Sequence, residues 1–114
     1  MTVYLLSLQI VQLDAFKKEI ADFPIETRED LFSLIFRFIS GERLNTNDFK
    51  TFKIDKKTKI LEFKVKDFKG NWRAVSTVVS GKYLVFVYAF HKKSQGLQEK
   101  DKDLIRQRIR RIEL

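Results

Sequence analysis

An apolar run near the end of the chain constrains the fold more than any other segment. Residues 83–90 are all apolar or aromatic, and the run stops abruptly at His91-Lys92-Lys93. A run of this length and composition predicts a buried strand. The single histidine of the chain therefore lies beside two lysines at a strand end, a position from which a rigid scaffold commonly presents functional side chains.

Two more strands precede this run. Residues 60–67 and 72–79 are also rich in apolar and β-branched side chains, and each short segment between the three runs contains a glycine. Glycine in such short connections favours tight turns. We therefore predict an antiparallel meander of three strands, with turns at residues 68–71 and 80–82.

The N-terminal segment predicts one strand and a short helix. Alternating apolar residues favour a strand over residues 3–10. Asp14 is a suitable N-cap for the helix that follows. This helix must end by Phe23, because the next residue is a proline, which disfavours the helical conformation in the residue before it.

A second, very apolar helix follows. The capping-box spacing of Thr27-Arg-Glu-Asp30 predicts its start, and Gly41 predicts its end. Its only polar stripe consists of Ser33, Arg37 and Ser40. A helix this apolar is either buried on most sides, which we favour, or bound to a partner.

The remaining elements complete an α+β domain. Residues 42–59 are polar and lysine-rich, and we expect a loop there with at most a short extra strand at 52–54. A final helix over about residues 98–112 has its acids first and its arginines last, as the helix dipole favours. The order β-α-α-β-β-β-α predicts one domain over residues 1–114, with helices packed on one face of a small, mostly antiparallel sheet. The other face is then free for function.

The composition excludes several kinds of function. With no cysteine and one histidine, the chain cannot form a disulfide, a cysteine-based zinc site or a histidine cluster. We expect no metal and no cofactor. No apolar run approaches the roughly 20 residues that span a bilayer. The start of the chain also lacks a signal-peptide pattern. We therefore expect a cytoplasmic protein that does not bind membranes.

The net charge of +8 is concentrated in the C-terminal part of the chain. Residues 1–49 carry a net charge of −3, whereas residues 50–114 carry +11. This asymmetry favours binding to a polyanion such as nucleic acid. From composition alone, a soluble basic protein whose lysines are merely solvated is an equally weighted alternative.

Three cations are predicted to converge on one face of the meander. We expect a four-residue turn over residues 68–71. Lys66 then lies opposite Arg73, and Lys64 shares their face, while the alternating apolar side chains of residues 61–65 point toward the helices. Like charges opposed across strands are unfavourable, so their convergence in solvent indicates an anion-binding surface. The alternative is a solvated lysine-rich face that discourages edge pairing.

The direction of His91 depends on the second turn. With a two-residue turn, Arg73 pairs with Tyr88 and His91 points to the apolar face. With a three-residue turn, Arg73 pairs with Ala89, and His91 and Lys93 join the cations. A slip of one residue reverses the conclusion, so the sequence leaves His91 open between a catalytic and a structural role.

These segments resemble the RelE/HigB superfamily of toxin–antitoxin mRNA interferases, and within it the phage-associated HigB-like branch. Residues 63–66, Phe-Lys-Val-Lys, are similar to an aromatic-Lys-x-Lys strand of that family, and residues 70–73, Gly-Asn-Trp-Arg, to its Gly-x-aromatic-Arg strand. Residues 90–95, Phe-His-Lys-Lys-Ser-Gln, resemble a segment that precedes a final amphipathic helix with an arginine pair. The resemblance is good over residues 60–112.

The resemblance implies a toxin that cleaves mRNA in the ribosomal A site without a metal, by attack of a 2′-hydroxyl on the adjacent phosphate. It implies that Lys64 and Lys66 are catalytic lysines and that Arg73 is the phosphate ligand. His91 would replace the tyrosine that some relatives use, since imidazole titrates near neutral pH. RNA contacts are expected from four further basic residues of this region, Lys92, Lys93, Arg106 and Arg110.

The implied partners are a cognate antitoxin, in a hetero-oligomer, and the ribosome with its mRNA. Two alternatives stay open. One is a non-catalytic toxin that resembles ParE and acts on DNA gyrase through protein contacts, which an exposed apolar helix at residues 31–39 would favour. The other is a plain RNA-binding module. Convergent cations favour cleavage, because a protein-binding surface does not need them.

Overall fold

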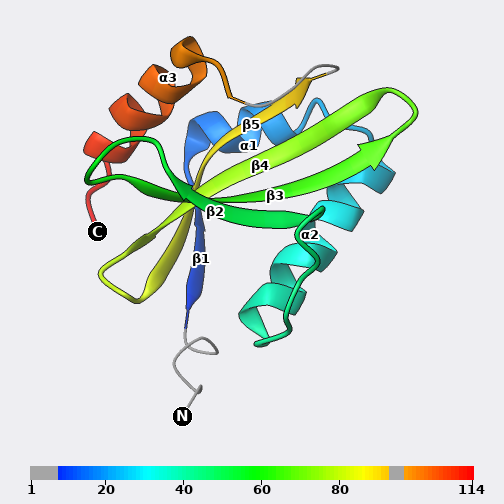
Figure 1. Ribbon diagram of the computed structural model, residues 1–114, viewed down its shortest axis with the longest axis horizontal. Helices are drawn as coiled ribbons and strands as arrows, with labels where there is room; N and C mark the ends of the chain where they lie inside the picture. The colour runs from blue at the N-terminus through cyan, green and yellow to red at the C-terminus, as the bar shows by residue number, and fades with distance from the viewer. Residues whose placement is uncertain (1–7, 93–96) are drawn as a thin grey trace.

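The computed structural model describes residues 8–92 and 97–114, which form an α+β domain with a five-stranded sheet (Figure 1). The predicted α+β class and mostly antiparallel sheet are confirmed. Of the strand predicted over residues 3–10, only the last part lies within the described residues. The elements are β1 Gln9–Gln12, α1 Asp14–Ile20, α2 Ile25–Ile39, β2 Phe49–Lys53, β3 Lys59–Asp67, β4 Gly70–Val79, β5 Tyr83–Lys92 and α3 Glu99–Arg110.

The sheet has the strand order β1-β5-β4-β3-β2. The meander β3–β4–β5 and the edge strand β2 pair antiparallel, whereas β1 pairs parallel with β5. The strand β4 lies in the middle of the sheet, between β5 and β3, and β4 and β5 contain more buried residues than the other strands. The edge strand β2 carries exposed lysines, which discourage pairing with other chains.

The first two helices both begin earlier than predicted, and neither has the N-cap predicted for it. Asp14 is the first residue of α1, and Leu13 occupies the N-cap. α2 begins at Ile25 directly after Pro24, so the capping box predicted at residues 27–30 is wrong. Proline suits the entry to a helix because it lacks the N–H that a first turn leaves unpaired. Thr27 is buried within the first turn of α2 and does not cap it.

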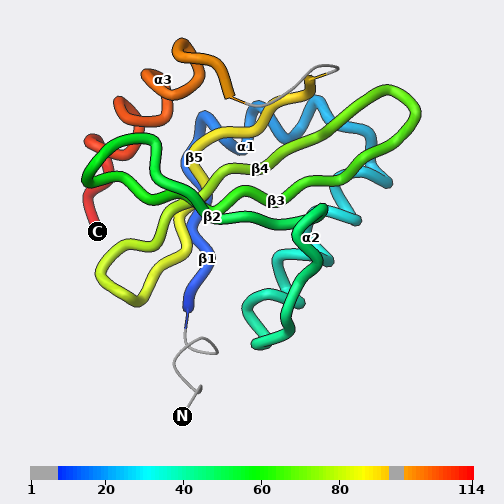
Figure 2. Tube along the Cα trace, viewed as in Figure 1, coloured from blue at the N-terminus to red at the C-terminus, as the bar shows by residue number. Residues whose placement is uncertain are grey.

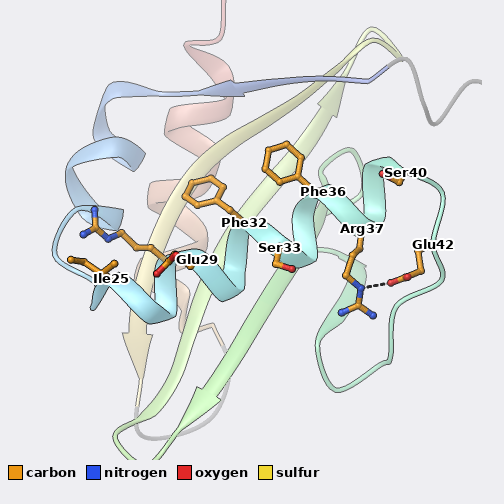
Figure 3. Close-up of a pocket in the computed structure, with 9 residues that line it drawn as sticks. Ile25, Glu29, Phe32, Ser33, Phe36, Arg37, Ser40 and Glu42 are labelled. Atoms are coloured by element: carbon orange, nitrogen blue, oxygen red, sulfur yellow. Dashed lines mark hydrogen bonds and ion pairs between the residues drawn. The ribbon is translucent and has the colours of Figure 1, made fainter.

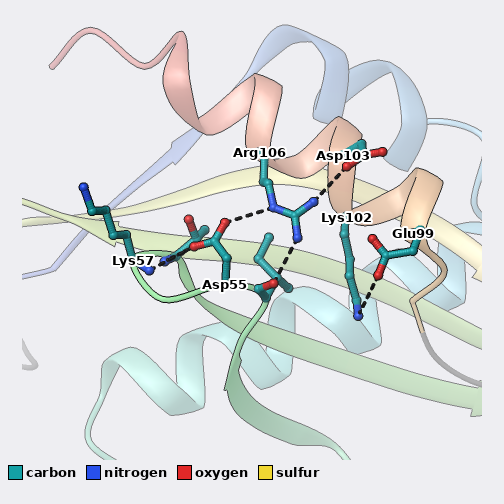
Figure 4. Close-up of polar contacts among 8 residues, drawn as sticks. Asp55, Lys57, Glu99, Lys102, Asp103 and Arg106 are labelled. Carbon is teal, nitrogen blue, oxygen red and sulfur yellow. Dashed lines mark hydrogen bonds and ion pairs between the residues drawn. The ribbon is translucent and has the colours of Figure 1, made fainter.

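Helices cover both faces of the sheet, and here the expectation of one covered face was wrong. One core lies between the sheet and α1 and α2, and includes Phe16, Ile35 and Phe63. A second core lies on the opposite face under α3, where Ile105 packs among strand residues such as Val75 and Val85. Figure 4 shows α3 and α2 on opposite sides of the sheet. Neighbouring strand residues such as Val75 and Ala74 are both apolar, so neither face could remain in water.

Candidate nucleic-acid interface

The β3–β4 hairpin sets the register of the predicted cations. Asp67 pairs with Gly70, so Phe68 and Lys69 form a two-residue turn in place of the expected four-residue turn. Gly70 has φ 129°, a conformation that residues with a Cβ rarely adopt. The side chain of Asp67 stabilises the turn by accepting a hydrogen bond from the Lys69 backbone N–H at 2.8 Å. The shift relative to the expected register is two residues, so every side chain keeps its predicted face.

Lys64, Lys66 and Arg73 therefore share one face of the sheet, as predicted. Lys64 is directly opposite Arg73, and Lys66 is opposite Asn71. Lys92 of β5 pairs with Asn71 on the other side and joins the same face. We call Lys64, Lys66, Arg73 and Lys92 the cation cluster. Its exposure is uneven: Lys66 is exposed, whereas Lys64 and Lys92 are half-buried.

Arg73 is buried, with only 5% of its surface exposed, so its expected solvent-facing position was wrong. Its Nη1 donates to Oε1 of Glu62 at 3.0 Å, and Glu62 itself is 2% exposed. The ring of Phe90, the β5 residue opposite Arg73, lies 6.0 Å from the guanidinium carbon. A second cation, Lys50 of β2, approaches the same carboxylate at 3.8 Å. Burial of the guanidinium is tolerated because it is paired.

The Arg73–Glu62 pair is not fully hydrogen-bonded. Within the described residues, Arg73 Nε and Glu62 Oε2 are buried and make no hydrogen bond. Unsatisfied buried polar atoms are costly and uncommon, and functional sites are one place where they occur. The guanidinium therefore keeps an N–H that a small movement could offer to an anion.

Helix α3 borders the cation cluster through Asp101. This buried carboxylate accepts a hydrogen bond from the hydroxyl of Tyr88 at 2.8 Å, and one of its oxygens lies 3.3 Å from the ammonium nitrogen of Lys92. Burial raises the pKa of Asp101, but hydrogen bonds from the Gln98 backbone, Tyr88 and Lys92 outweigh it and leave the pKa below its ordinary value. Burial and the bond to Asp101 raise the pKa of Tyr88, so this phenol is a poor proton donor at neutral pH.

His91 lies on the face opposite Arg73. The second turn has three residues, but β5 also contains a bulge: Val75 pairs with Tyr88, whereas Ser76 pairs with Phe86. The extra residue places His91 opposite Trp72, and the two rings stack with centroids 3.7 Å apart. His91 Nε2 lies 2.8 Å from the carbonyl oxygen of Lys69. These contacts tie the end of β5 to the β3–β4 turn, and they keep His91 out of the cation cluster.

The other basic residues expected to bind RNA differ in their surroundings. Arg106 is engaged by the carboxylates of Asp55 and Asp103, and by the carbonyl oxygen of Ile54, and so holds α3 to the β2–β3 connection (Figure 4). Arg110 is exposed and makes no ion pair within the described residues. Lys93 lies outside the described residues. Only Lys92 therefore joins the cation cluster.

The outer side of α2 forms an apolar groove of about 890 Å³, and two of its lining residues, Ser33 and Arg37, also line a small pocket with Lys66 of the cation cluster. Ile25, Phe32 and Phe36 line it, and the ion pair of Arg37 with Glu42 closes one end (Figure 3). Phe36 is 59% exposed. The expectation that α2 is buried on most sides was therefore only partly right: one side lies in the core, and the other faces solvent.

The site contains two acids. Glu62 precedes Lys64 by two residues, and strand alternation alone places it on the cation face, where the sequence allows it as the one acid among the cations. Asp101 was missed from the sequence, since only the packing of α3 brings it to Lys92. Within residues 8–92 and 97–114, no helix is long and apolar enough to cross a membrane. The same residues contain no group of three or more acids or histidines that could hold a metal ion.

Comparison with known proteins agrees with this architecture. A family profile described as "Phage derived protein Gp49-like (DUF891)" matches residues 10–110. A solved structure of the E. coli toxin RelE, a mutant in the free state, has a similar fold with a TM-score of 0.55. The alignment covers 93% of this chain and 98% of that one at 15% sequence identity, so the likeness concerns the fold. No curated protein matches the chain.

Proposed function

Because this chain belongs to the phage-derived Gp49-like family and has the fold of the toxin RelE, we propose that it is the toxin of a toxin–antitoxin pair and cleaves mRNA at the ribosome. In the proposed reaction, a ribose 2′-oxygen attacks the adjacent phosphorus and the bond to the 5′-oxygen breaks. The 2′-hydroxyl loses its proton to a base, and the leaving 5′-oxygen gains one. The products are a 2′,3′-cyclic phosphate and a 5′-hydroxyl.

The observation that carries this proposal is the cation cluster. Lys64 and Lys66 form no ion pair within the described residues, so their charges remain available to a phosphate. Arg73 is held from one side by Glu62. A fixed guanidinium and nearby ammonium groups suit a phosphorane, whose negative charge increases in the transition state.

We assign separate roles to these residues. Arg73 binds phosphate oxygens, because a guanidinium can donate two hydrogen bonds and stays charged throughout the reaction. Lys64, directly opposite Arg73, and Lys66, at the exposed end of the row, neutralise charge and transfer protons. Glu62 is a positioning residue that keeps the Arg73 side chain in one orientation. Its single charge leaves the site positive, since both Lys50 and Arg73 pair with it and Lys64 lies directly opposite Arg73.

The proposed partners follow from these surfaces. An acidic antitoxin segment would neutralise the cation cluster and block RNA, in a toxin–antitoxin hetero-oligomer. The ribosome and its mRNA are the proposed targets, which places the protein in the cytoplasm. The proposed reaction uses no metal and no cofactor.

The test is 5′-end mapping of cellular mRNA after brief induction. Wild-type protein should produce cuts inside translated codons. The double variant Lys64→Ala/Lys66→Ala should produce none above background, because it removes two charges from the cluster. Lys18→Ala/Lys82→Ala is the matched control, since both lysines are exposed and lie outside the cluster. Binding of RNA without cleavage by the wild type would instead indicate a plain RNA-binding module.

The groove on α2 favours a second candidate, a non-catalytic toxin that acts through protein contacts, as ParE-like toxins do on DNA gyrase. An exposed phenylalanine in an apolar groove is typical of a protein contact. Phe36→Ala separates the two candidates. It should leave mRNA cleavage and toxicity unchanged if the cation cluster is the active site. Loss of toxicity with intact mRNA and damaged DNA would favour the protein-contact toxin.

A further inference from the structure

The tip of the β3–β4 hairpin carries a phenylalanine without packing partners in the core. Phe68 is 93% exposed, more than any other large apolar side chain in the described part of the chain. Among the described non-glycine residues only Ser80 has a positive φ, so the turn backbone at Phe68 accepts almost any side chain and does not itself call for an aromatic one. An aromatic side chain at this position buries almost nothing within the protein, so its presence points to a ligand.

The surroundings of Phe68 are cationic. The ammonium of Lys69 lies 5.7 Å from the centre of the Phe68 ring. A pocket of about 710 Å³ beside the ring is lined by residues that include Lys66 and His91. The only acid lining this pocket, Asp67, has one carboxylate oxygen occupied by the Lys69 backbone N–H. An exposed ring flanked by two lysines matches a nucleotide, which offers a flat base and a phosphate.

The tip is also held in place. His91 contacts the Lys69 carbonyl oxygen at 2.8 Å and stacks on Trp72, whose side chain is buried in the core. The turn is thereby tied to β5 as well as to its own strands. Figure 2 shows this tip projecting at the end of the sheet opposite the β2–β3 connection. The backbone that carries Phe68 is thereby held in place, so a ligand that binds the ring does not have to order the turn.

We propose that the hairpin tip is a second RNA-binding site, in which Phe68 stacks on an unpaired base and Lys66 and Lys69 contact the phosphates beside it. The inference rests on the proposed function, because the same RNA strand would continue along β3 to Lys64 and Arg73. Alternate residues of a strand are about 7 Å apart, so Lys64 and Lys66 form a row that leads toward the tip. The site takes single-stranded RNA, since a paired base has no free face.

Binding to short RNA tests this site separately from cleavage. The probe is a labelled, single-stranded 2′-O-methyl oligoribonucleotide, which lacks the attacking hydroxyl. The comparison probe is an abasic oligomer of the same length and charge. Wild-type protein should bind the base-bearing oligomer about 10-fold more tightly than the abasic one. Phe68→Ala should bind both with the same, lower affinity, and Phe68→Trp should restore the difference. Phe36→Ala removes an exposed ring from α2 and should leave both affinities unchanged.

Three results would overturn the inference. The first is that wild type and Phe68→Ala show the same ratio between the affinities for the base-bearing and the abasic oligomer. The second is the absence of any binding to the free oligomer. The third is unchanged RNA affinity together with a loss of binding to phosphatidylglycerol vesicles in Phe68→Ala, which would make the tip a membrane contact. None of these results bears on cleavage, which is judged by 5′-end mapping and the Lys64→Ala/Lys66→Ala variant.

Discussion

At the scale of single residues, Arg73 serves both stability and the proposed chemistry. It is 5% exposed, and its partner Glu62 is 2% exposed. Removing one member of a buried ion pair leaves an uncompensated charge and typically costs about 3–5 kcal/mol. Loss of activity in an Arg73 variant therefore cannot by itself assign a catalytic role, and the charge of Glu62 must be removed at the same time.

We predict that Arg73→Ala lowers the free energy of unfolding by about 3–5 kcal/mol and abolishes cleavage. The double variant Arg73→Ala/Glu62→Gln should recover part of the stability, because it leaves no buried charge, and should recover no cleavage. Urea unfolding measures the first effect and 5′-end mapping the second. A double variant as unstable as Arg73→Ala would show that the charge of Glu62 is not the cause of the loss.

His91 is expected to act as an anchor for the hairpin. His91→Ala removes a stacked ring and one hydrogen bond, and should lower the free energy of unfolding by about 1–3 kcal/mol. Cleavage per folded molecule should stay within a few-fold of wild type, since His91 lies on the face opposite Arg73. Thermal unfolding and 5′-end mapping give the two numbers. Unchanged stability with a loss of cleavage on the order of 100-fold would identify His91 as the proton carrier after all.

At the scale of elements, polar contacts hold α3 on the sheet. Arg108 donates to both carboxylate oxygens of Glu19 in α1 and to the carbonyl oxygen of Val87. Val87 is the extra residue of the β5 bulge, where the strand ladder is interrupted. The bulge that turns His91 away from Arg73 thus also exposes a carbonyl group that α3 uses. Arg106 fastens the same helix to Asp55 beyond β2.

The contact between α3 and the β2–β3 connection should depend on pH. Hydrogen bonds from the Lys57 backbone, from Thr58 and from Arg106 lower the pKa of Asp55 from 3.8 to about 2. The charged form therefore stabilises the folded state above pH 4, and this contribution is lost as the pH falls toward 2. Wild type should lose thermal stability across this interval by more than Asp55→Asn does. Equal losses in thermal scans of the two proteins would show that Asp55 contributes nothing.

At the scale of the whole molecule, the charge distribution determines how RNA is attracted. A basic protein that neutralises phosphates releases condensed counterions, so its affinity falls with salt. The net charge of +8 is a property of the entire chain, whereas the cation cluster and the hairpin tip each bring lysines that form no ion pair within the described residues together with a guanidinium or an aromatic group. Specific contacts and general attraction can therefore be separated by variants with the same charge change.

We predict that the logarithm of RNA affinity falls linearly with the logarithm of salt concentration. Each phosphate contact contributes a slope of about −0.7 for a single strand. Lys64→Ala/Lys66→Ala should therefore reduce the magnitude of the slope by about 1.4, whereas Lys18→Ala/Lys82→Ala should change it by much less. Anisotropy titrations of the 2′-O-methyl oligomer over a range of salt concentrations measure both. Equal slopes in the two double variants would place the RNA elsewhere on the surface.

The sequence by itself determined the strands of the meander, the α+β class and the face of the cations. These features depend on local patterns, namely the apolar run over residues 83–90, the glycines at the turns, and the alternation of Lys64 and Lys66 with apolar residues. The predicted face of the cations is correct although the predicted turn length is wrong. The pairing register differs from the predicted one by two residues, and side chains return to the same face every two residues along a strand.

Only the tertiary structure decided the accessibility of Arg73, the direction of His91 and the position of α3. The β5 bulge is one extra residue, and it reverses the side on which His91 lies. Arg73 is buried because Glu62 and Phe90 surround it, and α3 covers the second face because neighbouring strand residues are apolar on both. Each of these outcomes depends on how segments distant in the chain pack against one another, which a local pattern does not encode.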